Sequence, residues 1–150
     1  MISNELSALY ERDINKLKSE ILKFTNEGNL WRAVPGVTNS AGNLCLHLAG
    51  NLQTYIGQNI GGVAYTRDRD AEFSLKGLSK SDLVSKIEHT HDVVGNTLSN
   101  LTDGALEQLY VENVLGYGMT NSYFLVHLLA HLSYHTGQIN YIRRILEAAG

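Results

Sequence analysis

Apolar residues recur every three or four positions in four stretches of the chain, which is the spacing of one face of an α-helix. The four predicted helices span roughly residues 4–26, 39–59, 79–101 and 121–148. Gly28 is expected to end the first helix, and Ser79 with Asp82 forms the pattern of a capping box at the start of the third. Four long helices without an internal repeat predict an all-α fold, an up-down four-helix bundle.

Two less regular segments lie between these helices. The segment "IGGVAYTRDRDAEFSLKG" (60–77) contains glycines and alternating charges, so we expect a long connection with no helix of its own. The simplest interpretation is that its charged residues are solvated and form surface ion pairs that contribute little stability. The segment "TDGALEQLYVENVLGYGMT" (102–120) shows little periodicity and precedes the last helix. Long connections in small domains often carry function, which keeps the first segment a candidate.

Size and composition favour one globular domain over residues 1–150. The chain is 43% hydrophobic and 18% charged, which is typical of a folded domain and not of a disordered one. No apolar run reaches the roughly 18 residues of a membrane span, and the charged start lacks the features of a secretory signal, so we expect no membrane association and a cytoplasmic location. A net charge of −3 without a Lys/Arg cluster argues against nucleic acid as a partner. Cys45 is the only cysteine and is predicted to be a buried thiol.

The last predicted helix contains "HLLAHLSYHTGQINYIRR" (127–144), in which His127, His131 and His135 follow one another at intervals of four residues. On a helical wheel they share a sector with Gln138 and apolar residues, so all three are predicted to point inward. Imidazoles four residues apart have Cβ atoms roughly 6 Å apart, which is close enough to converge on one ion. A third ligand must come from another helix. His47 is the best candidate, with Asn51 one turn further on.

The simplest alternative is that each inward histidine is a core residue whose nitrogens find ordinary hydrogen-bond partners. A cluster changes this balance, because each imidazole left unpaired in a core costs roughly 1–3 kcal/mol and a shared ion removes that cost for all of its ligands. We therefore favour a metal at His131 with His135. A zinc-protease motif is missing, no serine or cysteine nucleophile motif is recognisable, and only Glu88 with His91 resembles half of a di-iron pair. His91 remains a reserve ligand or a neighbour of the site, and His89 is predicted to be exposed.

At this point the residues resemble a known family. The helix "NLCLHLAGNLQTYI" (43–56) together with "HLLAHLSYHTGQINYIRRIL" (127–146) is similar to the DinB/YfiT-like superfamily of metal-dependent enzymes, and more narrowly to its DUF1572-type members. The resemblance spans nearly the whole chain and extends to "GGVAYTRDRDAEF". It is most specific at the pattern His-x-x-x-His-x-Gly-Gln, formed by His131, His135, Gly137 and Gln138.

The resemblance implies a four-helix bundle, usually a homodimer, with a nickel or zinc ion held by three histidines. By position these ligands are His47, His131 and His135. The remaining coordination positions would be open to water or to a small-molecule substrate. The resemblance makes His127 a pocket residue or a neighbour of the ligands, and Gln138 belongs to its pattern. By their positions on the predicted helices, Asn51 and His91 are further candidates to lie beside the ligands.

Such a site suggests two reactions. Three neutral imidazoles leave the ion its full charge and an open position, which lowers the pKa of a bound water or thiol. Relatives in the superfamily transfer low-molecular-weight thiols such as bacillithiol or mycothiol, or use them as cofactors, and others are described as hydrolases. The implied function is a metal-dependent transferase or hydrolase, in which Arg67 and Arg69 are candidates to bind a substrate carboxylate. The alternative is a non-catalytic dimeric bundle whose histidines form a structural or ligand-binding pocket.

Overall fold

A computed structural model of the protein describes residues 2–148, and its regular elements are helices joined by irregular connections. Its elements are α1 (Ile2–Leu22), η1 (Glu27–Trp31), α2 (Ala41–Leu52), the π-helical turn η2 (Gln53–Gln58), α3 (Arg69–Ser74), α4 (Lys80–Ser99), α5 (Asp103–Leu106) and α6 (Asn121–Ala148). Within residues 2–148 the only β-type pairing is an isolated antiparallel bridge between Leu109 and Thr120. The predicted all-α fold is confirmed.

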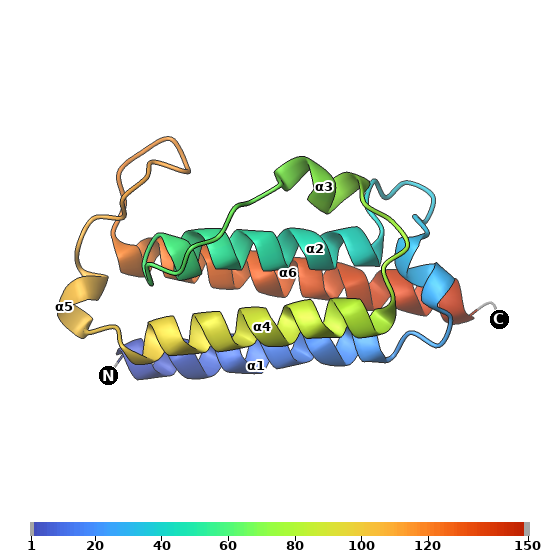
Figure 1. Ribbon diagram of the computed structural model, residues 1–150, viewed down its shortest axis with the longest axis horizontal. Coiled ribbons are helices and arrows are strands. Elements are labelled where there is room, and N and C mark those ends of the chain that lie inside the picture. The colour runs from blue at the N-terminus through green and yellow to red at the C-terminus, as the bar shows by residue number, and fades with distance from the viewer. Residues whose placement is uncertain (1, 149–150) are drawn as a thin grey trace.

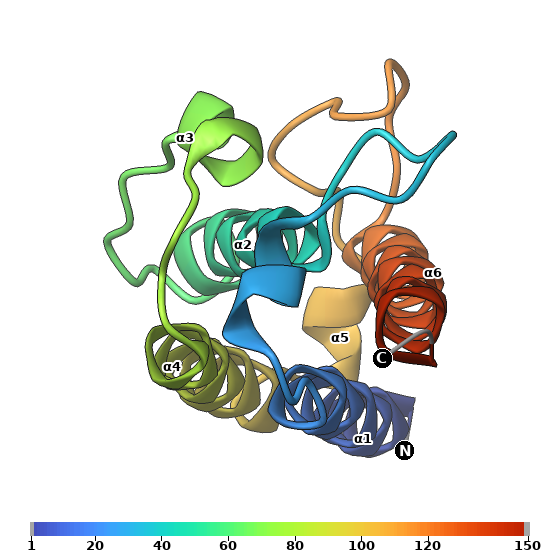
Figure 2. The same ribbon diagram turned by 90° about the vertical axis from the view of Figure 1, so that its right-hand side faces the viewer.

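The long helices α1, α2, α4 and α6 lie side by side and occupy four corners when viewed end on (Figures 1 and 2). Helices α1 and α2 each pack against both α4 and α6. Figure 1 shows α1 and α6 running in one direction and α2 and α4 in the other, so the order is up, down, down, up instead of a strict alternation. The reason is the connection between α2 and α4, which returns along the whole bundle before α4 begins.

The helix ends follow from local sequence, with one exception. The capping box predicted at Ser79 is present, since the Asp82 N–H donates to Ser79 Oγ (3.0 Å) and the Ser79 N–H donates to the Asp82 carboxylate (3.3 Å). The predicted end of the first helix at Gly28 is wrong. Helix α1 ends at Leu22, because the chain turns there to bury Phe24 completely, and Gly28 lies inside η1.

The connection 60–77 was predicted to lack a helix, and this is wrong. It contains α3, which is capped at its start by Asp68: the Asp68 carboxylate accepts a hydrogen bond from the Ala71 N–H (3.1 Å). A six-residue helix is too short to display a hydrophobic period, which explains why the sequence pattern did not predict it. Figure 1 shows α3 lying across α2, so this connection brings its side chains to the outer surface of α2.

The core runs the length of the bundle. Every residue of α2 is buried, whereas α1, α4 and α6 bury only one face. Cys45 is buried as predicted, and burial raises the pKa of its thiol to about 12. No helix within residues 2–148 combines the length and the apolar character that crossing a membrane requires.

Candidate metal centre

Three histidines from two helices meet at the α2–α6 contact. His47 comes from the middle of α2, and His131 and His135 lie one turn apart on α6. The His131 Nε2 atom is 3.2 Å from His47 Nε2 and 3.1 Å from His135 Nε2. With bonds of roughly 2.0–2.1 Å to an ion, neighbouring nitrogens would be about 2.9 Å apart at a right angle and about 3.4 Å apart at a tetrahedral angle. Both measured separations fall between these values, so the two nitrogen pairs fit a shared ion.

The histidine cluster has too few N–H protons for every ring nitrogen to take part in a hydrogen bond. His47 Nδ1 is 3.1 Å from the Glu72 carboxylate and His135 Nδ1 is 2.7 Å from the Gln138 side-chain oxygen, so each Nδ1 carries the proton and donates it. The Nε2 atoms of both rings therefore present lone pairs toward His131 Nε2. A neutral His131 can donate to only one of them, and its own Nδ1 is buried without a partner among residues 2–148. A cation between the three rings would accept all three lone pairs.

Burial keeps the cluster in the form that binds metals. Burial, followed by the proximity of His135 and His47, lowers the pKa of His131 from 6.5 to about 4. Burial also lowers the pKa of His135, against the hydrogen bond to Gln138, which raises it. Both rings are therefore neutral near pH 7, and a neutral imidazole is the ligand form of histidine.

Sequence reasoning missed Glu72, a buried carboxylate on α3 that holds His47. Its Oε2 accepts from Arg67 Nε (2.8 Å) and its Oε1 accepts from Arg67 Nη2 (3.0 Å), in addition to the bond from His47. Burial alone would raise the pKa of this carboxyl, but the hydrogen bonds from His47 and Arg67 outweigh burial and lower it. Glu72 is therefore an ionised acceptor that fixes the proton of His47 on Nδ1, which is the usual arrangement behind a metal-binding histidine.

Glycine at position 50 makes room for this carboxylate. A Cβ atom at Gly50 would lie 1.9 Å from Glu72 Oε2, far closer than any contact allows. The sequence signal that could have predicted the contact is a glycine inside a strongly helical stretch, one turn from His47, which often marks the close approach of another group. The charged connection then offered several carboxylates as partners, and the sequence alone does not select Glu72.

Only some of the other residues predicted for the site lie near the histidine cluster. Gln138 contacts His135, and Asn51 is buried on α2 with its side-chain oxygen unpaired among the described residues. The prediction that His127 points inward is wrong, because it is exposed and stacks on Phe124 with ring centroids 5.8 Å apart. His91 is not brought to the cluster. It faces α1 and lines a separate cavity between α1 and α4, while His89 is exposed.

The two predicted substrate-binding arginines have protein partners. Arg67 is paired with Glu72, and its guanidinium carbon also lies 5.5 Å from the centre of the Tyr55 ring. Arg69 is exposed and lies over Phe73 at 5.7 Å. The Phe73 ring in turn packs on the His47 ring, with centroids 4.9 Å apart. The connection thus supplies a carboxylate and an aromatic ring that both contact His47.

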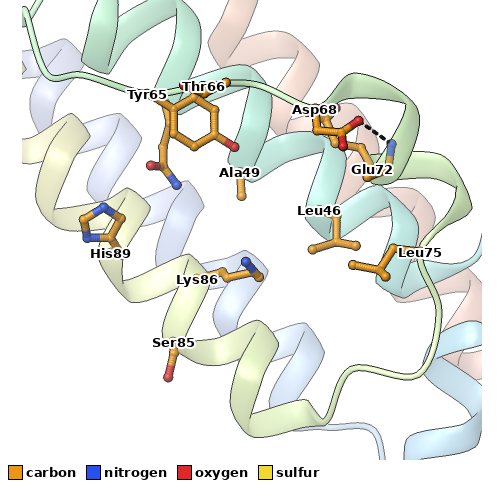
Figure 3. Close-up of a pocket in the computed structure, with 12 residues that line it drawn as sticks. Leu46, Ala49, Tyr65, Thr66, Asp68, Glu72, Leu75, Ser85, Lys86 and His89 are labelled. Carbon is orange, nitrogen blue, oxygen red and sulfur yellow. Dashed lines mark hydrogen bonds between the residues drawn. The ribbon is translucent and has the colours of Figure 1, made fainter.

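A cavity of about 500 Å³ lies on the opposite side of Glu72, between α2, α4 and the connection (Figure 3). Tyr65 and Glu72 line it from the connection, and Lys86 and His89 line it from α4. None of the three clustered histidines lines this cavity. Glu72 therefore lines this cavity and also contacts the histidine cluster through His47.

Comparisons with known proteins agree with this architecture. Residues 5–150 match a family described as "Protein of unknown function (DUF1572)". A conserved protein from Enterococcus faecalis has a similar structure, with 16% identity, 96% of each chain covered and a TM-score of 0.72. A DinB-like protein from Bacillus cereus ATCC 10987 has a TM-score of 0.69 with 18% identity, covering 89% of this chain and 85% of its own. Identities this low show a shared fold. The comparison with curated proteins yields no match.

Proposed function

The chain belongs to the DUF1572 family, and we propose that it is a metal-dependent enzyme whose divalent ion, nickel or zinc, is held by His47, His131 and His135. The observation that supports this most is the convergence of three imidazole nitrogens with too few protons between them. Imidazole nitrogens suit both metals. Such an ion supplies positive charge and open coordination positions that lower the pKa of a bound thiol or water.

The surrounding residues have definable roles in this proposal. Glu72 and Gln138 accept the Nδ1 protons of His47 and His135 and so aim both Nε2 lone pairs inward. Arg67 neutralises the charge of Glu72, which leaves the site with the charge of the ion itself. Phe73 covers one side of the His47 ring and keeps water from it.

The surroundings of the cluster bear on the choice between transfer of a low-molecular-weight thiol and hydrolysis. Cys45 is buried with a raised thiol pKa, so in a thiol transfer the sulfur nucleophile would come from a small molecule. Hydrolysis would need a general base, and Glu72, the carboxylate that contacts the cluster, is engaged by two donors with its pKa lowered. We therefore propose a thiol S-transferase, with a metal-dependent hydrolase as the second candidate.

Metal content and turnover test this proposal together. We expect elemental analysis of the purified protein to find close to one transition-metal ion per chain, and His131→Ala to lose it, with His89→Ala as the exposed control. Metal-loaded protein should then consume one of several low-molecular-weight thiols in the presence of electrophiles. A protein that binds metal but turns over neither thiols nor hydrolysable esters would support the non-catalytic alternative.

A further inference from the structure

The cavity beside Glu72 has the size of a binding site for a small molecule. Its volume of about 500 Å³ lies within the roughly 300–1,000 Å³ of ligand pockets in proteins. Helix α3 packs on α2 but makes no comparable contact with α4, which leaves the cavity open between the connection and α4. None of the three clustered histidines lines it, so it is distinct from the place where the metal would bind.

Much of the surface inside this cavity is apolar. Leu46 and Ala49 line it from α2 and are buried, being 7% and 6% exposed. Ala71 and Leu75 line it from the connection, and Leu75 is 43% exposed although leucine side chains are mostly buried in folded proteins. An apolar ligand would remove these side chains from water, which is favourable in proportion to the area covered.

Two hydrogen-bond donors lie beside this apolar surface. Lys86 of α4 takes part in none of the ion pairs within residues 2–148. Burial raises the pKa of the Cys45 thiol and the charge of Lys86 opposes this, so the ammonium group lies near α2. Burial, followed by the charge of Glu72, raises the pKa of Tyr65, which therefore keeps its hydroxyl proton. Figure 3 shows Lys86 and Tyr65 on opposite sides of Ala49.

We propose that this cavity binds a small organic monocarboxylate whose carboxylate pairs with Lys86 and whose apolar body covers Leu46, Ala49 and Leu75. An ammonium group and a phenolic hydroxyl both donate, so together they suit an anionic acceptor. Lys86 is the only fixed positive charge among the described residues that line the cavity, which explains why one carboxylate is expected.

The negative charges of the lining restrict the ligand further. Glu72 is paired with Arg67, but Asp68 takes part in no ion pair within residues 2–148 and caps α3 through the Ala71 N–H. Figure 3 shows Asp68 beside Glu72, at the α3 end of the cavity. A second carboxylate on the ligand would be repelled there, so a monocarboxylate fits better than a dicarboxylate.

Glu72 connects this cavity to the histidine cluster. Its carboxylate lines the cavity and accepts from His47 Nδ1 at 3.1 Å. A ligand that contacts α2, α4 and the connection at once would hold α3 on α2, and with it Glu72 against His47. A ligand shifts an equilibrium toward the state that it binds better, so an occupied cavity should tighten metal binding. This coupling rests on the proposed metal centre, whereas binding in the cavity does not.

Calorimetric titration of metal-free protein, dialysed free of chelator, tests the site. The probe is octanoate, with octanol as the uncharged analogue and acetate as a carboxylate without an apolar body. We expect saturable binding of one octanoate per chain and much weaker binding of both analogues. Lys86→Gln should weaken octanoate binding about tenfold, whereas Lys16→Gln, at an exposed lysine of α1, should not.

A second variant separates loss of space from loss of charge. Ala49→Leu places extra apolar volume in the cavity and should prevent octanoate binding with Lys86 still present, while circular dichroism confirms that the chain is folded. A wild-type protein that binds no octanoate, equally strong binding of octanol, or octanoate binding that Lys86→Gln leaves unchanged would each overturn the site.

The coupling is tested by repeating the metal titration with saturating octanoate. We expect the metal Kd to fall about fivefold or more in wild-type protein and to stay unchanged in Lys86→Gln. An unchanged Kd in wild-type protein would overturn the coupling. Tightening that persists in Lys86→Gln would overturn it as well, because octanoate would then contact the ion directly. A protein that binds octanoate but no metal would support the site and contradict the proposed function alone.

Discussion

The α1–α4 pair and the α2–α6 pair belong to one bundle but bury different chemistry. Helices α1 and α4 bury mainly aliphatic residues against each other, such as Ile14 and Ile87. Helices α2 and α6 meet through His47, His131 and His135, with Asn51 one turn away. Buried imidazoles and amides cost stability unless they are paired, so the cluster is tolerated within a core to which all four long helices contribute apolar side chains. The histidine cluster is thus a polar exception on the α2–α6 side of that core.

The largest effect is expected from the apolar pair. Ile14→Ala removes a side chain that is only 2% exposed and should lower the free energy of unfolding by about 2–5 kcal/mol. Because Ile14 is remote from the histidines, the folded protein should bind metal with unchanged affinity. Denaturant unfolding and calorimetric titration measure the two quantities, with exposed Asn15→Ala as the control. A large loss of metal affinity would show that the two pairs are not separable.

An effect of intermediate size, on metal affinity, is expected from Glu72 and Gly50, which hold His47 in place on the α2–α6 side. Glu72→Gln preserves shape but removes the ionised acceptor of His47, so metal affinity should fall about 10–100-fold. Gly50→Ala should have a similar effect, because its Cβ atom would displace the same carboxylate. Asp70→Asn on the exposed side of α3 is the matched control. Competition titration with a metal indicator measures each variant, and wild-type affinity in Glu72→Gln would remove Glu72 from the site.

The free energy of unfolding is expected to depend on pH because of His131, which lies on the α2–α6 side. The pKa of His131 is lowered from 6.5 to about 4, so between these values the unfolded chain binds a proton that the folded chain does not. The free energy of unfolding of metal-free protein should therefore fall as the pH is lowered from 6.5 toward 4. His131→Leu should show a shallower decline in thermal melts with chelator. Equal slopes in the two proteins would contradict the assigned burial of His131.

The smallest effect is expected at His91, which belongs to the α1–α4 side. It is partly exposed and its ring contacts the Asp92 carboxylate at 3.4 Å. His91→Ala should change stability by no more than about 0.5 kcal/mol and leave metal affinity within twofold. Thermal unfolding and the same metal titration check this. A strong loss of affinity would place His91 functionally with the histidine cluster despite its position.

The sequence predicts the long helices because their apolar spacing extends over many turns. It also predicts the pairing of His131 with His135, because four residues along one helix fix that geometry. It does not predict the position of His127 correctly. Three residues at intervals of four rotate by 80° around a helix, and the first of them passes the edge of the buried face.

The remaining errors concern residues whose neighbours are set by contacts between distant segments of the chain. His91 lies on an apolar face of α4, but the sequence does not say whether that face meets α1 or α2. Glu72 lies on a helix too short to show a hydrophobic period, and Gly50, against which its carboxylate packs, belongs to a different helix. Both are contacts between distant segments, which local spacing does not encode.

The most direct test of the central claim is a thermal melt of the protein with and without metal. An ion that binds only the folded chain must stabilise it, by an amount that grows with the logarithm of its concentration relative to its Kd. We predict that zinc or nickel raises the melting temperature, that binding saturates at one ion per chain, that chelator reverses the shift and that His131→Ala abolishes it. An unchanged melting temperature in wild-type protein, with no ion bound at saturation, would contradict the three-histidine metal centre.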